Sequence, residues 1–243
     1  LLLARRKVPE IVEEALETAG RSSRRVRDLP ADLMVWLVVA MGLFRRLSIP
    51  AAWARLSDGF RGKLRRRRGK KPTSSAFTQA RKRLGVDAVR ILFERFVGEI
   101  KGRFASRHLW RGMNVVALDG TTAKAPDSKL NRKEFGGPSS HRGKCGYPFV
   151  RIVTLVAVYT HLVLAAAVAG WTTGENPLAL TLLAALDPGS LVLMDRGFVS
   201  YGLLWSILKR PCHFVVRGKR KLRMKKRVNL GEALDVERGQ RAV

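Results

Sequence analysis

Residues 191–198 read Leu191-Val192-Leu193-Met194-Asp195-Arg196-Gly197-Phe198, and this stretch decides the fold of the chain. Four apolar residues suit a buried parallel strand, because such strands are continuous apolar runs. An aspartate and a glycine turn follow at once, and polar working residues of α/β sheets collect where such strands end. The pattern occurs earlier in Asn114-Val115-Val116-Ala117-Leu118-Asp119-Gly120. The sequence therefore predicts two buried strands that each end in an aspartate.

The chain after residue 110 alternates strands with helices. Apolar runs predict strands at 114–118, 149–159, 162–169, 191–194 and 212–216, and helices at 176–186 and 201–209. The order is β-β-β-α-β-α-β, with a loop expected from Thr121 to Pro148. If the first and fourth strands are neighbours in the sheet, Asp119 and Asp195 lie side by side.

The chain before residue 105 is predicted to be helical. A short amphipathic helix stops at Gly20, an apolar helix runs from Leu29-Pro30 to Phe44, and another opens at Ile49-Pro50. Two further helices meet at Gly85, which is a typical helix stop. That pair is either a helix-turn-helix or an ordinary helical hairpin, and the loose turn pattern leaves both open.

The charge of the chain points to a polyanionic partner. Lys+Arg is 47 against Asp+Glu 19, so the net charge is +28, and nucleic acid suits it better as a partner than a membrane does. A run from Arg61 to Lys71 and a second run from Arg217 to Arg227 hold much of this charge. The alternative for such a run is a solvated loop. The residues expected to contact DNA are Arg65, Arg66, Arg67, Arg68, Lys70, Lys71, Arg81, Arg83, Arg196, Arg217, Lys219 and Arg220.

The remaining composition predicts a cytoplasmic, nucleoid-associated protein without a membrane segment. The longest apolar run, Leu33 to Phe44, is shorter than the roughly 20 residues of a membrane helix and suits a core helix. Cys145 and Cys212 lack metal-ligand spacing and suggest a reducing compartment. Both ends of the chain look cut.

The two aspartates predict a metal site. Neighbouring carboxylates repel each other unless a cation lies between them, and Mg²⁺ or Mn²⁺ prefers such oxygen ligands. Paired ions of this kind serve in-line displacement at phosphorus. The alternative for either aspartate alone is a turn residue that accepts a hydrogen bond from the next backbone amide.

These strings resemble the IS4 group of DDE transposases, whose catalytic core has the RNase H-like fold. The resemblance rests on Leu118-Asp119-Gly120-Thr121-Thr122, Pro126-Asp127-Ser128, Asn131, Phe135-Gly136 and Met194-Asp195-Arg196-Gly197-Phe198, and upstream on Leu29-Pro30, Ser75, Gln79-Ala80-Arg81, Leu84-Gly85 and Leu92-Phe93. It covers about residues 8 to 230. It implies an α/β chain with a helical DNA-binding domain at 1–107, then a mixed-sheet RNase H-like catalytic domain at 108–243 with flanking helices and an incomplete C-terminal part.

The resemblance also implies roles. Asp119 and Asp195 are expected to be the first two catalytic, metal-binding acids, with Mg²⁺ (or Mn²⁺) as cofactor. The expected reaction is cleavage at the ends of an insertion sequence and strand transfer into target DNA. The expected partners are double-stranded DNA, as terminal repeats and target, and further copies of the chain on that DNA. A β-rich insertion is expected to begin at about residue 218.

One part of the family pattern is absent. The third acid should stand in Tyr, two residues, Arg, three residues, Glu, six residues, Lys, and none of Tyr147, Tyr159 or Tyr201 begins such a string. Glu232 and Glu237 come too soon after the last strand. The alternatives are therefore an active transposase, a catalytically inactive remnant that only binds DNA, and a nuclease relative that acts on RNA–DNA hybrids or junctions. The long helical N-terminal region disfavours the last.

Overall fold

The computed structural model describes residues 7–23, 25, 28–59, 72–104, 109–140, 143–144 and 146–218. The chain divides into two compact units. The first contains Leu1–Leu109 with Leu162–Ala165, and the second contains Trp110–His161 with Ala166–Val243. The predicted boundary at residue 107 and the insertion expected from about 218 lie outside the described residues or at their edge.

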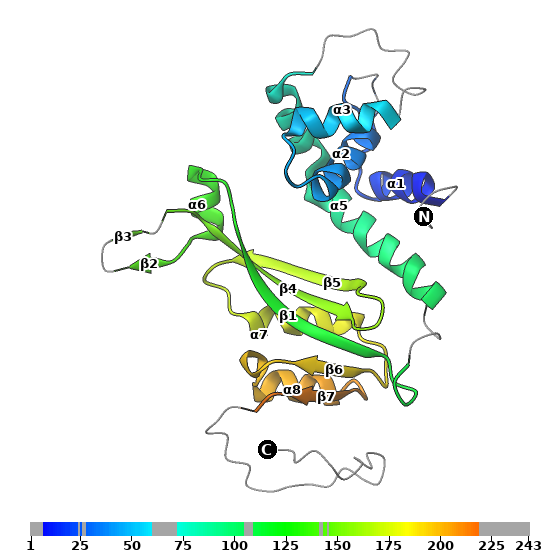
Figure 1. Cartoon of the computed structure of the whole chain (residues 1–243), viewed down its shortest axis with the longest axis vertical. Coiled ribbons are helices and arrows are strands. Elements are labelled where there is room, and N and C mark those ends of the chain that lie inside the picture. The colour runs from blue at the N-terminus through cyan, green and yellow to red at the C-terminus, as the bar shows by residue number, and fades with distance from the viewer. Residues whose placement is uncertain are drawn as a thin grey trace, which may run out of the picture. The chain divides into compact units, whose positions relative to one another are not determined.

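The first unit is helical, as the sequence predicted. Its helices are α1 (Lys7–Thr18), α2 (Ala31–Leu43), α3 (Ile49–Gly59) and α5 (Ser74–Phe104) (Figure 1). They share one apolar core, whose largest fully buried side chains include Phe77, Met34 and Leu37. The apolar helix predicted from Leu29-Pro30 is α2, and its burial in this core confirms that it is a core helix.

A left-handed glycine ends α1. Gly20 has a φ of +62°, and its amide donates to the carbonyl of Glu17 at 2.9 Å. The amide of Arg21 reaches back to the carbonyl of Leu16 at 2.8 Å. This pair of bonds is the Schellman ending, which needs a residue without a Cβ penalty at the left-handed position. The backbone of Arg21 is therefore fixed by the end of α1.

Gly85 interrupts α5 without ending it. Thr73 caps the helix, since its hydroxyl accepts a hydrogen bond from the amide of Ala76 at 3.2 Å. Gly85 alone leaves helical geometry, with φ 75° and ψ 173°, and the helix resumes at the next residue. A helix-turn-helix needs a turn of about 3–4 residues. The predicted meeting of two helices at Gly85 is therefore confirmed, and their one-residue junction is too short for a helix-turn-helix.

The second unit contains a mixed five-stranded sheet, except for the first residues of one edge strand, which are grouped with the first unit. Its strands are β1 (Val115–Lys124), β4 (Phe149–Ala157), β5 (Val163–Gly170), β6 (Leu191–Met194) and β7 (His213–Val216), in the order β5-β4-β1-β6-β7 (Figure 1). β1 pairs antiparallel with β4 and parallel with β6, and β6 pairs parallel with β7. This is the RNase H-like strand order, so the predicted fold class and the adjacency of the first and fourth strands are confirmed.

Two predicted details were wrong. β1 continues to Lys124 rather than ending at Leu118, because its partner β4 pairs with it as far as Lys124↔Phe149. The expected loop from 121 to 148 also contains α6 (Lys129–Phe135) and a short ladder of β2 (Ser139–Ser140) with β3 (Gly143–Lys144). Residues 120–124 are Gly-Thr-Thr-Ala-Lys, so this part of β1 has few of the apolar residues from which strands were predicted.

Two helices cover one face of the sheet. α7 (Glu175–Leu182) packs on β4 and α8 (Tyr201–Leu208) on β7, and the helices contact each other, so they share that face (Figure 1). The 3₁₀ turns η1 (Leu183–Ala185) and η2 (Arg196–Phe198) lie on either side of β6 in the sequence. None of the described helices is long and apolar enough to cross a membrane.

Candidate active site at the carboxyl end of the parallel strands

Strand register brings the two predicted acids together. Leu118 of β1 pairs with Met194 of β6 in the parallel ladder. Asp119 is the next residue of β1, and Asp195 is the first residue after β6. The two aspartates therefore occupy equivalent positions on neighbouring strands, whose axes lie about 4.8 Å apart. The juxtaposition that the sequence predicted on condition of strand adjacency is present.

Both acids leave the sheet on the same face. Leu118 and Met194 are buried, at 3% and 7% exposure, and Gly120, two residues after Leu118 on the same face of β1, lies against Glu175 of α7. Successive side chains of a strand point to opposite faces. Asp195 keeps extended backbone, with φ −81° and ψ 175°. Asp119 and Asp195 therefore project from the face opposite α7 and α8, and both are exposed.

Each carboxylate has one oxygen held by a backbone amide and one oxygen left over. The amide of Gly120 donates to Asp119 Oδ1 at 2.8 Å, and the amide of Gly197 donates to Asp195 Oδ1 at 2.8 Å. The Oδ2 atoms accept no hydrogen bond from a described residue. Each Oδ1 thus accepts a turn hydrogen bond, as the alternative to metal binding predicted. The two Oδ2 atoms are still available, and they are hard oxygen donors of the kind that Mg²⁺ and Mn²⁺ require.

Arg217 follows β7 at the same end of the sheet as the two aspartates. Val216 of β7 pairs with Met194, and the amide of Arg217 donates to the Met194 carbonyl at 3.3 Å. Arg217 therefore follows β7 at the level where Asp195 follows β6, and its side chain is exposed. Arg196, the first residue of η2, is exposed directly after Asp195. Two aspartates and two arginines thus follow the parallel strands at the same end of the sheet.

A third acid is absent from this group. Among the residues that the structure describes, no group of three or more His, Cys, Asp and Glu side chains is placed to hold a metal ion. Glu232 and Glu237 lie outside those residues. Glu175 is close in space, because a Cβ on Gly120 would lie 2.8 Å from its carboxyl carbon. Gly120 follows Asp119 and faces the other side of the sheet, so Glu175 lies on the face away from the acids.

Glu175 has a partner that the sequence reasoning missed. Gly174 is the N-cap of α7, and Glu175 is the first helical residue. Arg151 Nη1 lies 3.2 Å from Glu175 Oε1, with side-chain exposures of 19% and 31%. The Arg151 guanidinium also stacks over Trp171 at 5.2 Å. The signal was a lone arginine in the apolar run of β4, since a charge there needs a partner.

Of the remaining residues that were predicted to contact DNA, two are described by the structure and the others are not. Arg81 and Arg83 are exposed on α5. The other predicted contacts lie outside the described residues, namely Arg65, Arg66, Arg67, Arg68, Lys70, Lys71, Lys219 and Arg220.

Two family models match the chain. The model described as "Insertion element 4 transposase N-terminal" matches residues 1–94, and the model described as "Transposase DDE domain" matches residues 110–242. Together these matches extend over both units of the structure.

Two relatives from Escherichia coli (strain K12) are similar in sequence. The transposase InsG for insertion sequence element IS4 is 31% identical over 212 residues, which are 86% of this chain and 46% of that protein. InsZ, provisionally named a transposase, is 30% identical over 220 residues, which are 87% of this chain and 69% of that protein. The chain thus spans about half the length of the IS4 relative.

Two solved structures match the chain with low overall similarity. A piggyBac transposase synaptic complex with hairpin DNA has a TM-score of 0.37 and 14% identity, over 89% of this chain and 50% of that chain. A Mos1 transposase paired-end complex with the left transposon end has a TM-score of 0.30 and 8% identity, over 79% of this chain and 60% of that chain. At these TM-scores the likeness carries no weight beside the sequence matches. On those matches, the chain belongs to the IS4 family of DDE transposases, a family of phosphoryl-transfer enzymes.

Proposed function

We propose that this chain cleaves and rejoins DNA phosphodiester bonds at the ends of an insertion sequence, with Asp119 and Asp195 as its metal-binding catalytic carboxylates. The observation that supports this most is the shared register and shared face of the two acids beyond Leu118↔Met194. Family membership supports the reaction class.

In this proposal the residues of the site have different roles. Asp119 and Asp195 each present one oxygen, and the amides of Gly120 and Gly197 hold the other oxygen and so orient the carboxylate. Bound Mg²⁺ or Mn²⁺ would supply charge neutralisation at the phosphate and acidify the attacking water or 3′ hydroxyl. We propose that Arg217 and Arg196, which are exposed next to the two acids, pair with DNA phosphates near the reacting one by charge-assisted hydrogen bonds.

Duplex DNA is the proposed substrate and partner. The net charge of +28 favours a polyanion, and a phosphodiester backbone is the polyanion on which the chemistry acts. We further propose that the DNA is the element's terminal repeats and its target, that several copies act together on paired ends, and that the place of action is nucleoid DNA in the cytoplasm.

A second candidate function is DNA binding without catalysis. It is favoured by the finding that no third acid joins Asp119 and Asp195 among the described residues. Such a protein would occupy element ends and interfere with full-length copies. Both candidates share the helical unit and differ only in whether the acids act.

Calorimetry with Mn²⁺ tests the site directly. The starting chain should bind Mn²⁺, and Asp119→Asn with Asp195→Asn should abolish binding, because two anionic oxygen donors are removed. Glu134→Gln is the matched control, since Glu134 is an exposed acid of the same unit. Equal binding by the parent and the double variant would remove the two acids from a common site.

Nicking of a supercoiled plasmid that carries an element end separates the two candidates. Metal-dependent nicking by the parent, abolished in Asp119→Asn, supports the transposase. Tight binding of the same plasmid without nicking supports the DNA-binding candidate.

A further inference from the structure

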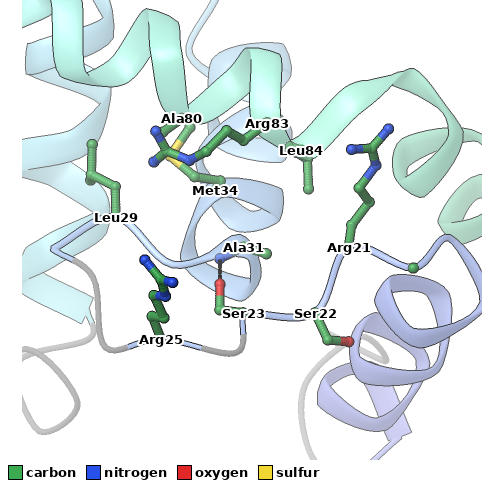
Figure 2. Close-up of a pocket in the computed structure, with 11 residues that line it drawn as sticks. Arg21, Ser22, Ser23, Arg25, Leu29, Ala31, Met34, Ala80, Arg83 and Leu84 are labelled. Carbon is green, nitrogen blue, oxygen red and sulfur yellow. Dashed lines mark hydrogen bonds between the residues drawn. The ribbon is translucent and has the colours of Figure 1, made fainter.

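The helical unit contains a cavity of about 410 Å³ that is lined by three arginines and two serines. Arg21, Ser22, Ser23 and Arg25 come from the segment between α1 and α2, and Arg83 comes from α5 (Figure 2). Side chains from segments some 60 positions apart in the sequence thus meet around one hollow. The predicted DNA-binding residues included Arg83 but neither Arg21 nor Arg25.

The floor of this arginine cavity is apolar. Leu29, Met34, Ala80 and Leu84 line it and are 6%, 1%, 2% and 3% exposed. All four belong to the core of the helical unit. The cavity is therefore a depression over packed core side chains, with its arginines and serines around it.

The two glycine features of the unit fix Arg21. The Schellman ending at Gly20 sets its backbone, and its guanidinium lies against the kink of α5, where a Cβ on Gly85 would be 3.5 Å from Arg21 Nε. Ser23 then closes the segment, because its hydroxyl accepts a hydrogen bond from the amide of Ala31 at 2.9 Å. This bond also supplies the acceptor that Pro30, at the N-cap of α2, does not.

The charges around the cavity are unbalanced. None of the described residues that line the cavity is an aspartate or a glutamate. Within the described residues, none of Arg21, Arg25 and Arg83 has an ion pair, whereas Arg90, Arg95, Arg132 and Arg151 each have one. All three guanidinium groups are exposed. Like charges around one hollow repel each other until an anion enters it.

We propose that the arginine cavity binds a backbone phosphate of duplex DNA. The planar fork of arginine matches phosphate oxygens, and hydroxyls such as that of Ser22 commonly donate to them. A volume of about 410 Å³ exceeds what one phosphate needs and leaves room for the attached sugar, which the apolar floor suits. The inference rests on the proposed function in one respect, namely that DNA is the partner.

Fluorescence anisotropy of a labelled duplex, measured over a range of salt concentrations, tests the proposal. The cavity variant is Arg21→Gln, Arg25→Gln, Arg83→Gln. The matched control is Arg45→Gln, Arg46→Gln, Arg55→Gln, which removes the same charge from exposed arginines of the same unit outside the cavity. Thermal unfolding of both variants checks that the helical unit stays folded.

The cavity variant should bind the duplex at least tenfold more weakly than the control variant. Its slope of log affinity against log salt should become shallower by about 0.9 for each phosphate that the cavity no longer neutralises. The variant Arg21→Lys, Arg25→Lys, Arg83→Lys keeps the charge but has no guanidinium fork, so its affinity should lie between the two.

Failure of the cavity and failure of the proposed function give different results. Equal weakening in the cavity and control variants, with a parent that binds, overturns the cavity alone. A parent that does not bind duplex DNA at low salt overturns the proposed function and this inference with it. A third outcome is that inorganic phosphate raises the melting temperature of the parent but not of the cavity variant, while the two proteins bind DNA with equal affinity. The cavity would then be a site for a free anion, and the proposal would be overturned.

Discussion

Gly197 both holds the carboxylate of Asp195 and leaves no space beside it. Its amide donates to Asp195 Oδ1, and a Cβ on Gly197 would lie 3.0 Å from the same oxygen. Any side chain here must push the carboxylate by a few tenths of an ångström. The glycine of the Asp-Arg-Gly-Phe string is therefore needed for the position of the acid, although its φ is not left-handed.

Gly197→Ala should weaken Mn²⁺ binding by about 3- to 10-fold, which corresponds to about 0.7–1.4 kcal/mol. The physical reason is the displacement of Asp195 from its hydrogen bond. Calorimetry measures the effect. Gly202→Ala is the control, because a Cβ on Gly202 meets nothing within 4 Å. Unchanged affinity in Gly197→Ala would show that Asp195 does not bind the ion.

Arg151 and Glu175 should stabilise the sheet unit as a pair. Arg151→Met and Glu175→Gln should each lower the free energy of unfolding by about 1–3 kcal/mol, because each removes the opposite charge beside a partly buried partner. The double variant should be destabilised by less than the sum of the single variants. Urea unfolding of the four proteins measures this coupling, and strictly additive effects would contradict it.

Among the helices, α5 depends on one backbone angle. Gly85→Ala should destabilise the helical unit by about 1–3 kcal/mol, because φ 75° with ψ 173° is a conformation that side chains strain. Gly98→Ala is the control within the same helix, since Gly98 is exposed and open and alanine should stabilise by about 0.5–1 kcal/mol. Thermal unfolding separates them. Equal effects of the two variants would mean that the kink is not required.

The start of α6 should show acid sensitivity. A hydrogen bond from Arg132 holds the pKa of Asp127 below its ordinary value, and Arg132 also donates to the carbonyl of Gly146 at 2.8 Å. Because the folded pKa is depressed, this stabilisation is present above the unfolded pKa and is lost as pH falls through the folded pKa. The difference in melting temperature between the parent and Asp127→Asn should therefore shrink on acidification. A difference that is constant from neutral to acid pH would contradict this.

The elements that the sequence predicted well are those with apolar patterns of their own. α2, β4 and β6 are strongly apolar, and their positions followed from periodicity and length. The end of β1 could not be predicted, because this part of the strand forms by pairing with β4, which is a tertiary contact. The local sequence Gly120-Thr121-Thr122 does not indicate a strand. The same holds for α6, a helix of seven residues without a buried side chain.

The candidate site was predicted in part for the same reason. Asp119 and Asp195 follow apolar strands and stand out in the sequence. Arg21 and Arg25 do not, because their meeting with Arg83 depends on a helix ending and on a kink far along the chain. Local pattern identifies residues at strand ends, whereas a rim built from separate segments requires the folded unit.

For the whole molecule, the net charge of +28 should act on stability as well as on binding. The melting temperature should rise as NaCl increases from about 0.02 to about 0.2 M, because the Debye length falls from about 20 to about 7 Å and self-repulsion is screened. Differential scanning calorimetry measures this rise. A melting temperature independent of salt would show that the positive charges do not repel one another appreciably in the folded state.

The backbone of Asp119 is held by more strand pairing than the backbone of Asp195. Asp119 lies inside a ladder, opposite Thr154 and five residues before β1 ends, whereas Asp195 lies one residue beyond the last rung of β6. Local opening at a strand end costs far less than opening a central strand. We therefore expect the two carboxylates to separate through fraying at the end of β6 more often than the sheet itself opens.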